Sequence, residues 1–170
     1  MNIFKSAVYS VSEYTSIQKA CNTNTLPVLV TGVSAVHKAQ LAFALSESAP
    51  VLVIAEDEAS ALRFSEDINE MAGEQVAFAY PAKDFVFTEA IGVSREYEHK
   101  RIEVLSRILS GDCRIVTASA EAALQLTIPK ENLKNYTITL KKDTEIAISA
   151  LIEKLIGAGY SRAPEKVEGV

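Results

Sequence analysis

Residues 27 to 46 read Pro-Val-Leu-Val-Thr-Gly-Val-Ser-Ala-Val-His-Lys-Ala-Gln-Leu-Ala-Phe-Ala-Leu-Ser, the outline of a strand, a glycine loop and a helix. This outline is typical of phosphate-binding loops, in which Gly, four residues and then Gly-Lys-Ser/Thr wrap backbone N–H groups around phosphate. On that template Gly32 takes the first glycine, His37 the second glycine, Lys38 the lysine and Ala39 the Ser/Thr. Two of the four required residues are therefore replaced.

The replacements at His37 and Ala39 each remove a feature that nucleotide binding or hydrolysis requires. The second glycine lets the backbone approach phosphate closely, and the imidazole of His37 would obstruct that approach. Ala39 has no oxygen for Mg²⁺, and Lys38 alone cannot restore the metal. We therefore predict a nucleotide-binding scaffold that holds no cofactor and no metal at this loop. The alternative is an ordinary strand, turn and helix that never bound phosphate.

The composition is that of a globular protein with a substantial apolar core. Of the 170 residues, 48% are hydrophobic and 23% are charged. No apolar run reaches the length of a bilayer span, and the start Met-Asn-Ile-Phe-Lys-Ser lacks the apolar segment of a secretory leader. We expect a cytoplasmic protein with no membrane contact.

Cysteine spacing and charge exclude further classes of site. Cys21 and Cys113 are far apart and show no Cys-x-x-Cys or Cys/His cluster, so we expect neither disulfide nor zinc but two core thiols. The net charge is −5, and no basic stripe with interleaved aromatic residues is present. This chain alone is therefore not expected to bind DNA tightly.

Hydrophobic periodicity predicts alternating strands and helices as far as Leu126. Ser10-Val-Ser-Glu13 predicts a capping box at the start of the first helix. The predicted strands are 28–31, 51–55, 75–80 and 114–118, and the later helices are 35–47, 58–71, 94–110 and 119–126. This order predicts an α/β fold, a parallel sheet with helices on both faces, of the phosphate-loop NTPase type.

After Pro129 the pattern changes to that of a small α+β unit. Residues 136–140 alternate as a half-exposed strand, and 145–156 show the period of a helix. Because little follows that could pair with them, we predict a first domain over 1–136 and the partial start of a second domain over 137–170.

Three other features of the sequence do not by themselves indicate a catalytic or metal site. Glu56, Asp57 and Glu58 follow a strand and precede a helix, where acids more often cap the helix than bind metal. His99 has no second His nearby and is expected on the surface. The connection 81–93 has no clean period, and connections of that length are usually functional or packed over an edge.

The ordered series of these pieces resembles the transcription-repair coupling factor family (Mfd), in the N-terminal region that is itself similar to excinuclease subunit UvrB. The resemblance covers nearly the whole chain after Leu26. Its pieces are Thr31-Gly32, Val51 to Ala55, Tyr80-Pro81-Ala82, Arg101 to Leu105, Arg114 to Ala118, Thr139 to Lys142, Leu151 to Leu155 and Gly159 to Arg162.

The resemblance implies a UvrB-like domain 1a with a degenerate phosphate loop, followed by the beginning of a domain 2 that recruits UvrA. It implies a non-catalytic platform, because the ATP- and Mg-dependent DNA translocase motor and the RNA polymerase and DNA contacts of that family lie further along its chains. The residues that grip UvrA are expected mainly beyond Val170.

One segment departs from the family, and two other functions compete. Val86 to Glu89 and Gly92-Val93 replace the Leu-Pro-Tyr-Asp and Ser-Pro pattern of the family, which leaves that loop without a predicted role. Arg101 matches, but an Arg on a helix flank is more often a surface ion pair. The competing functions are a divergent ATPase that uses Lys38 with Ser34 or Thr31, and a ligand-binding α/β domain of another kind.

Overall fold

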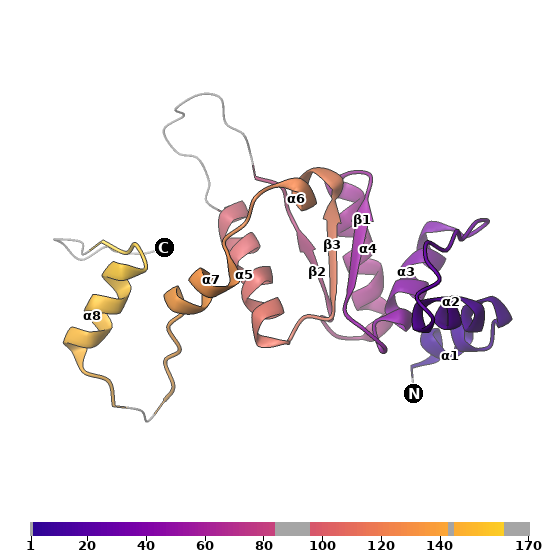
Figure 1. Cartoon of the computed structure of the whole chain (residues 1–170). Coiled ribbons are helices and arrows are strands. Elements are labelled where there is room, and N and C mark those ends of the chain that lie inside the picture. Colours follow the sequence, from indigo (N-terminus) through magenta and orange to yellow (C-terminus); the bar gives the residue numbers. More distant parts are fainter. Residues whose placement is uncertain (1, 84–95, 143–144, 162–170) are drawn as a thin grey trace. The chain divides into compact units, whose positions relative to one another are not determined.

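The computed structural model describes residues 2–83, 96–142 and 145–161 (Figure 1). The chain divides into two compact units, residues 1–126 and residues 127–170. This division lies ten residues before the one that the sequence suggested after Tyr136. The connection 81–93 and the residues around Ser94 fall largely outside the described part.

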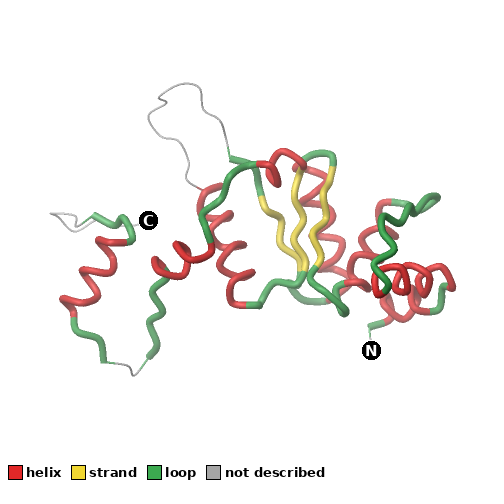
Figure 2. Tube along the Cα trace, viewed as in Figure 1, coloured by secondary structure: helices red, strands yellow, loops and turns green. Residues whose placement is uncertain are grey.

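The first unit is built on a three-stranded parallel sheet. Its strands are β1 (Val51–Ala55), β2 (Ala77–Tyr80) and β3 (Ile115–Ser119), in the order β1-β3-β2. Val53 lies opposite Thr117, and Ala79 lies opposite Thr117 on the other side. The predicted α/β class with a parallel sheet is confirmed (Figure 2).

The described residues of the first unit form six helices. They are α1 (Ile3–Tyr9), α2 (Ser12–Asn22), α3 (Ala35–Leu45), α4 (Glu58–Ala72), α5 (Glu96–Ser110) and α6 (Ala120–Leu124). Helices α1 and α2 lie beside α3 and not on the sheet (Figure 1). The acid-cap prediction is confirmed, because Asp57 Oδ1 accepts the Ser60 N–H at 2.7 Å at the start of α4. Gly73 ends α4 at a φ of 73°, a conformation that favours glycine.

The two faces of the sheet bury two separate clusters. One cluster joins the sheet to α3 and α4, and it contains Ala39, Ala42, Phe43, Ile68, Met71, Ala77 and Ile115. The other joins the opposite face to α5 and α6, and it contains Phe78, Tyr80, Ala82, Val104, Cys113, Ala118 and Ala122. On this second face α5 packs against β2 and α6 packs against β3, while Leu52 and Ile54 of β1 stay exposed.

The predicted strand over 28–31 is wrong. These residues form no strand and pair with none of the three strands of the sheet, and Leu29 is 87% exposed. Strand propensity alone does not make a strand, because the backbone N–H and C=O groups need a neighbouring strand to pair with.

The N-terminus also differs from the prediction. Helix α1 was not foreseen; its cap is Asn2, whose side-chain oxygen accepts the Phe4 N–H at 2.9 Å. The predicted capping box is wrong, because Ser10 ends α1 and its hydroxyl donates to Ala7 O at 2.7 Å. Helix α2 then begins without a side-chain cap. Cys21 is exposed, so the expected core thiol is found only at Cys113.

The second unit holds two helices among its described residues, α7 (Lys130–Tyr136) and α8 (Ile148–Gly157). The predicted strand over 136–140 is wrong, because α7 runs to Tyr136 and the described residues after it form no strand. No other strand is present in the described part of this unit to pair with it. Helix α8 confirms the helix predicted over 145–156, and its Ile148 is 76% exposed, whereas α7 was not predicted.

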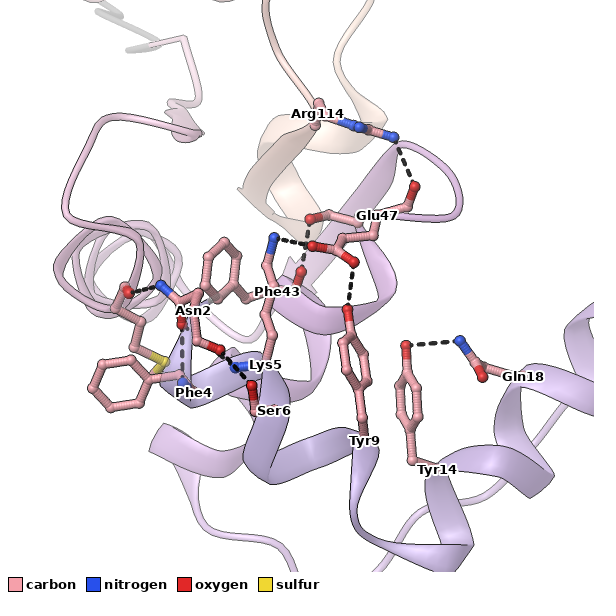
Figure 3. Close-up of polar contacts among 12 residues, drawn as sticks. Asn2, Phe4, Lys5, Ser6, Tyr9, Tyr14, Gln18, Phe43, Glu47 and Arg114 are labelled. Atoms are coloured by element: carbon pink, nitrogen blue, oxygen red, sulfur yellow. Dashed lines mark hydrogen bonds and ion pairs between the residues drawn. The ribbon is translucent and has the colours of Figure 1, made fainter.

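Polar contacts attach the N-terminal helices to the rest of the first unit (Figure 3). Asn2 Nδ2 donates to Met71 O at 2.7 Å at the end of α4, and Gln40 Nε2 on α3 donates to Phe4 O at 2.7 Å. The Glu47 carboxylate accepts hydrogen bonds from the Lys5 ammonium and the Tyr9 hydroxyl of α1. These contacts place α1 beside α3, and α2 packs against α1.

Candidate functional site

The loop before α3 keeps one feature of a phosphate-binding loop. Gly32 has a φ of 73°, and no atom lies within 4 Å of the position that a Cβ would take there. The backbone conformation, and not a crowded space, therefore accounts for glycine at this position. Helix α3 begins at Ala35, with Ser34 as its N-terminal cap.

Ser34 and His37 are hydrogen-bonded to each other at the start of α3. The Ser34 hydroxyl lies 2.8 Å from His37 Nδ1 and accepts the His37 backbone N–H at 3.5 Å. Ser34 is thus the cap of the helix, and its oxygen takes the N–H group that a bound phosphate would use. A Ser34 hydroxyl held in this way is a poor substitute for a magnesium ligand.

Lys38 and Ala39 point to different environments. The Lys38 side chain is exposed, and its ammonium group makes no hydrogen bond or ion pair with any described residue, although its backbone N–H donates to Ser34 O at 2.9 Å. Ala39, at the position of the metal-binding hydroxyl, is 0% exposed and packs in the cluster with Phe43 and Ile115. The structure therefore brings Gly32, Ser34 and His37 together, but it buries Ala39 in the core.

A cavity of about 420 Å³ lies in front of this loop, between it and the first two helices. Gly32, Val33 and His37 line it from the loop side, and most of its other lining residues are apolar. Among the described residues that line it, Glu13 carries the one carboxyl side chain and none is a Lys or Arg. A triphosphate in this cavity would meet a carboxylate and no cation, so the space favours apolar groups.

The structure also revises Arg101, which the sequence suggested as a surface ion pair. Its side chain is only 3% exposed, and Arg101 Nη1 donates to Pro81 O at 2.6 Å. The guanidinium carbon lies 4.1 Å from the centre of the Tyr80 ring. The helical spacing of Arg101 and Val104 on one face of α5 was the pattern that could have indicated burial.

Within the described residues, no three His, Cys, Asp or Glu side chains gather closely enough to hold a metal ion. Asp57 is engaged as a helix cap, and the Ser60 backbone N–H holds the pKa of that carboxyl below its ordinary value. Glu56 and His99 are exposed. In the described ranges, no helix combines the length and the apolar character that crossing a bilayer requires.

Comparison with known proteins supports the family resemblance. The chain is 21% identical to the transcription-repair-coupling factor of Bacillus subtilis over 165 residues, which is 96% of this chain and 14% of that protein. It is 23% identical over 137 residues to the transcription-repair-coupling factor of Staphylococcus epidermidis, which is 79% of this chain and 12% of that protein. No family model and no solved structure matches.

These matches are low in identity but agree with one another and cover most of the chain. The chain is related to a region of the transcription-repair coupling factors (Mfd), and it spans only about an eighth of the length of the relatives it matches.

Proposed function

We propose that this Mfd-related chain is a non-catalytic module of a transcription-repair coupling factor. In this proposal its α/β unit is a rigid platform with a degenerate phosphate loop. The platform supports the adjoining unit in recruiting UvrA to lesions where RNA polymerase has stalled. ATP, Mg²⁺ and DNA are handled by other parts of such a protein.

The observation that carries the proposal is the burial of Ala39. This residue occupies the position of the metal-binding hydroxyl and is 0% exposed, within the cluster that includes Phe43. Without an oxygen at that place the loop has no protein ligand for Mg²⁺, and phosphoryl transfer depends on the positioning and charge that the metal supplies. A loop of this kind can keep its shape without acting on nucleotide.

Two further observations agree with this proposal. The cavity in front of the loop has no cation in its lining, although phosphate recognition relies on cations and free backbone N–H groups. The net charge of −5 would repel a phosphate backbone.

The competing function is a divergent ATPase that holds nucleotide with Lys38 and with Ser34 or Thr31. Lys38 is exposed and free to meet a ligand, which is the observation in its favour. Ser34, however, would have to leave its contact with His37 and give up the cap of α3.

Calorimetric titration of the chain with Mg-ATP tests the nucleotide part of the proposal. We expect no binding in the micromolar range, no hydrolysis, and the same result for Lys38→Ala. Micromolar binding that Lys38→Ala abolishes would contradict the proposal and favour the divergent ATPase.

Co-elution with purified UvrA on size exclusion tests the recruiting part. The chain is compared with a version that continues past Val170 with the residues that follow in its gene. We expect UvrA to co-elute with the longer version. A longer version that never retains UvrA would overturn the recruiting role, and would favour a ligand-binding domain of another kind.

A further inference from the structure

The cavity in front of the glycine loop has a mainly apolar wall. It lies within the first unit, where α1 packs against both α2 and α3, and its volume is about 420 Å³. Cavities of about 150 Å³ with apolar linings bind benzene, so this one has room for a molecule with two rings. Its larger aliphatic lining residues are Val8, Val11, Ile17, Val30, Val33 and Leu41.

Part of this apolar lining is in contact with water. Val11, at the start of α2, is 47% exposed, and Val30, in the segment before Gly32, is 42% exposed. Removal of apolar surface from water is the dominant favourable contribution to most association. A ligand with an apolar surface would therefore be stabilised by covering these two side chains.

The polar side chains of the lining already have partners in the protein. The Tyr14 hydroxyl accepts from Gln18 Nε2 at 3.1 Å, and Gln40 Nε2 donates to a backbone carbonyl of α1 at 2.7 Å. His37 Nδ1 lies 2.8 Å from the Ser34 hydroxyl. Among the described residues that line the cavity, none carries a buried side-chain nitrogen or oxygen without a partner. The lining therefore does not require a polar ligand.

Tyr14 forms a fixed aromatic part of the wall. Its side chain is 3% exposed, and its ring centre lies 5.3 Å from that of Tyr9. With the ring packed and the hydroxyl hydrogen-bonded to Gln18, this side chain has little freedom left to lose when a ligand binds. The wall also offers a ring against which an aromatic ligand can pack.

The charge of the lining disfavours anions. Glu13 carries the one carboxyl among the lining residues, and none of them is a Lys or Arg. Its own backbone N–H and then the Ser12 hydroxyl lower the pKa of this carboxyl, so it is ionised at neutral pH. An anionic ligand would meet a like charge with no Lys or Arg beside it.

We propose that this cavity binds a small, uncharged, apolar molecule, such as an aromatic compound with two rings. The ligand packs against the aliphatic side chains and the Tyr14 ring, and it covers Val11 and Val30. The site lies beside the degenerate phosphate loop, but its ligand class is the opposite of a nucleotide. The inference does not depend on the recruitment of UvrA.

Two fluorescent probes that share one skeleton test this ligand class. N-phenylnaphthylamine is uncharged, and anilinonaphthalene sulfonate adds one negative charge to the same rings. Titration of the whole chain at constant ionic strength should show saturable binding of N-phenylnaphthylamine at one site. The affinity for the sulfonate should be lower by roughly fivefold or more, because of the like charge. Equal affinities, or no saturable binding of the uncharged probe, would overturn the proposal.

Charge reversal separates the effect of Glu13 from that of the net charge and of the size of the sulfonate. Glu13→Lys should raise the affinity for the sulfonate and leave the affinity for the uncharged probe within roughly twofold. The matched control Glu66→Lys changes the net charge by the same amount at an exposed position of α4 that does not line the cavity, and it should preserve the preference. A preference that Glu13→Lys leaves unchanged would contradict the assigned role of charge.

Ala7→Leu locates the probe. Ala7 lines the cavity from an exposed position of α1, so the larger side chain takes up part of the space without replacing a buried residue. We expect the affinity for N-phenylnaphthylamine to fall by roughly tenfold, since a close-packed ligand no longer fits. Ala123→Leu makes the same change at an exposed position of α6 and should bind as the wild type does. Binding that a folded Ala7→Leu chain does not weaken would contradict the site.

A second measurement uses the ¹⁵N-labelled wild-type chain, so it does not rely on the folding of any variant. N-phenylnaphthylamine should shift the backbone amides of Val8, Val33 and Leu41 saturably. Helix α8 also exposes apolar side chains, at Ile148 and Ile156. Saturable shifts confined to α8 would assign the probe to the second unit and overturn the proposal.

Discussion

Lys5 Nζ lies 2.8 Å from Glu47 Oε1, although 42 residues separate the two in the chain. The same carboxylate accepts the Tyr9 hydroxyl at 2.6 Å, and the Glu47 carbonyl accepts from Arg114 Nη2 at 3.1 Å (Figure 3). The Lys5 ammonium also lies 4.1 Å from the centre of the Phe43 ring. Glu47 therefore joins α1 to the end of α3 and to the start of β3.

Glu47→Gln should lower stability near neutral pH but not in acid. Hydrogen bonds from Lys5 and then Tyr9 lower the pKa of the Glu47 carboxyl. Because the folded pKa is below its ordinary value of 4.5, the stabilisation is present above that value and is lost as the pH falls through the lowered one. The side chain is half exposed, so we expect a loss below about 1 kcal/mol.

Urea unfolding of the wild-type and Glu47→Gln chains across the acidic range measures this difference. Glu66→Gln, an exposed acid on α4, is the matched control and should show no such change with pH. A difference that grows as the pH falls would contradict the assigned contacts.

Tyr9 should ionise later than an ordinary tyrosine. Burial raises the pKa of its hydroxyl, and the hydrogen bond to Glu47 and the negative charge of that carboxylate raise it further. The associated stabilisation is present below the ordinary pKa of 10.0 and is lost as the pH rises through the raised value.

Ultraviolet titration of tyrosine ionisation checks this prediction. Tyr9→Phe should remove the component that ionises at the highest pH, and Glu47→Gln should move that component to lower pH. An unchanged titration curve in Glu47→Gln would show that the carboxylate does not influence Tyr9.

Ala39→Ser restores the missing hydroxyl of the loop but should not restore nucleotide binding. The new oxygen would lie in the core beside Phe43 and not at the loop surface. We expect a loss of about 1 kcal/mol, because a buried hydroxyl must be desolvated and finds its acceptor only in its own helix.

Chemical unfolding and Mg-ATP titration of Ala39→Ser provide the two measurements. Ala150→Ser, at an exposed position of α8, is the matched control for the change in side chain. Micromolar Mg-ATP binding by Ala39→Ser would show that the loop lacked only its hydroxyl.

The two thiols should differ in reactivity. Cys21 is exposed, while Cys113 is buried, and burial raises the pKa of the Cys113 thiol. The thiolate is the reactive form, so a disulfide reagent should label Cys21 quickly and Cys113 only when the chain opens. Cys21→Ser should remove the fast phase, and an equally fast second phase in that variant would contradict the burial of Cys113.

Sequence patterns predicted those helices and strands whose ends and apolar faces depend only on residues close together in the chain. The strand 51–55, the Asp57 cap of α4 and its stop at Gly73 all follow from short-range rules, because capping and left-handed glycine depend on neighbours along the chain. The substitutions at His37 and Ala39 could also be read directly, since a missing glycine or hydroxyl is visible in any fold.

Contacts between distant segments decided the rest. Residues 28–31 have the apolar character of a buried strand, yet they lie exposed because no strand of the described sheet pairs with them. Arg101 carries the character of a surface residue, yet it is buried because Tyr80 and Pro81 at the end of β2 and Gln125 after α6 contact its guanidinium. Pairing of strands and the groups that meet a buried charge depend on residues that are remote in the chain. Local periodicity can place Arg101 on the same face of α5 as Val104, but it does not identify those remote residues.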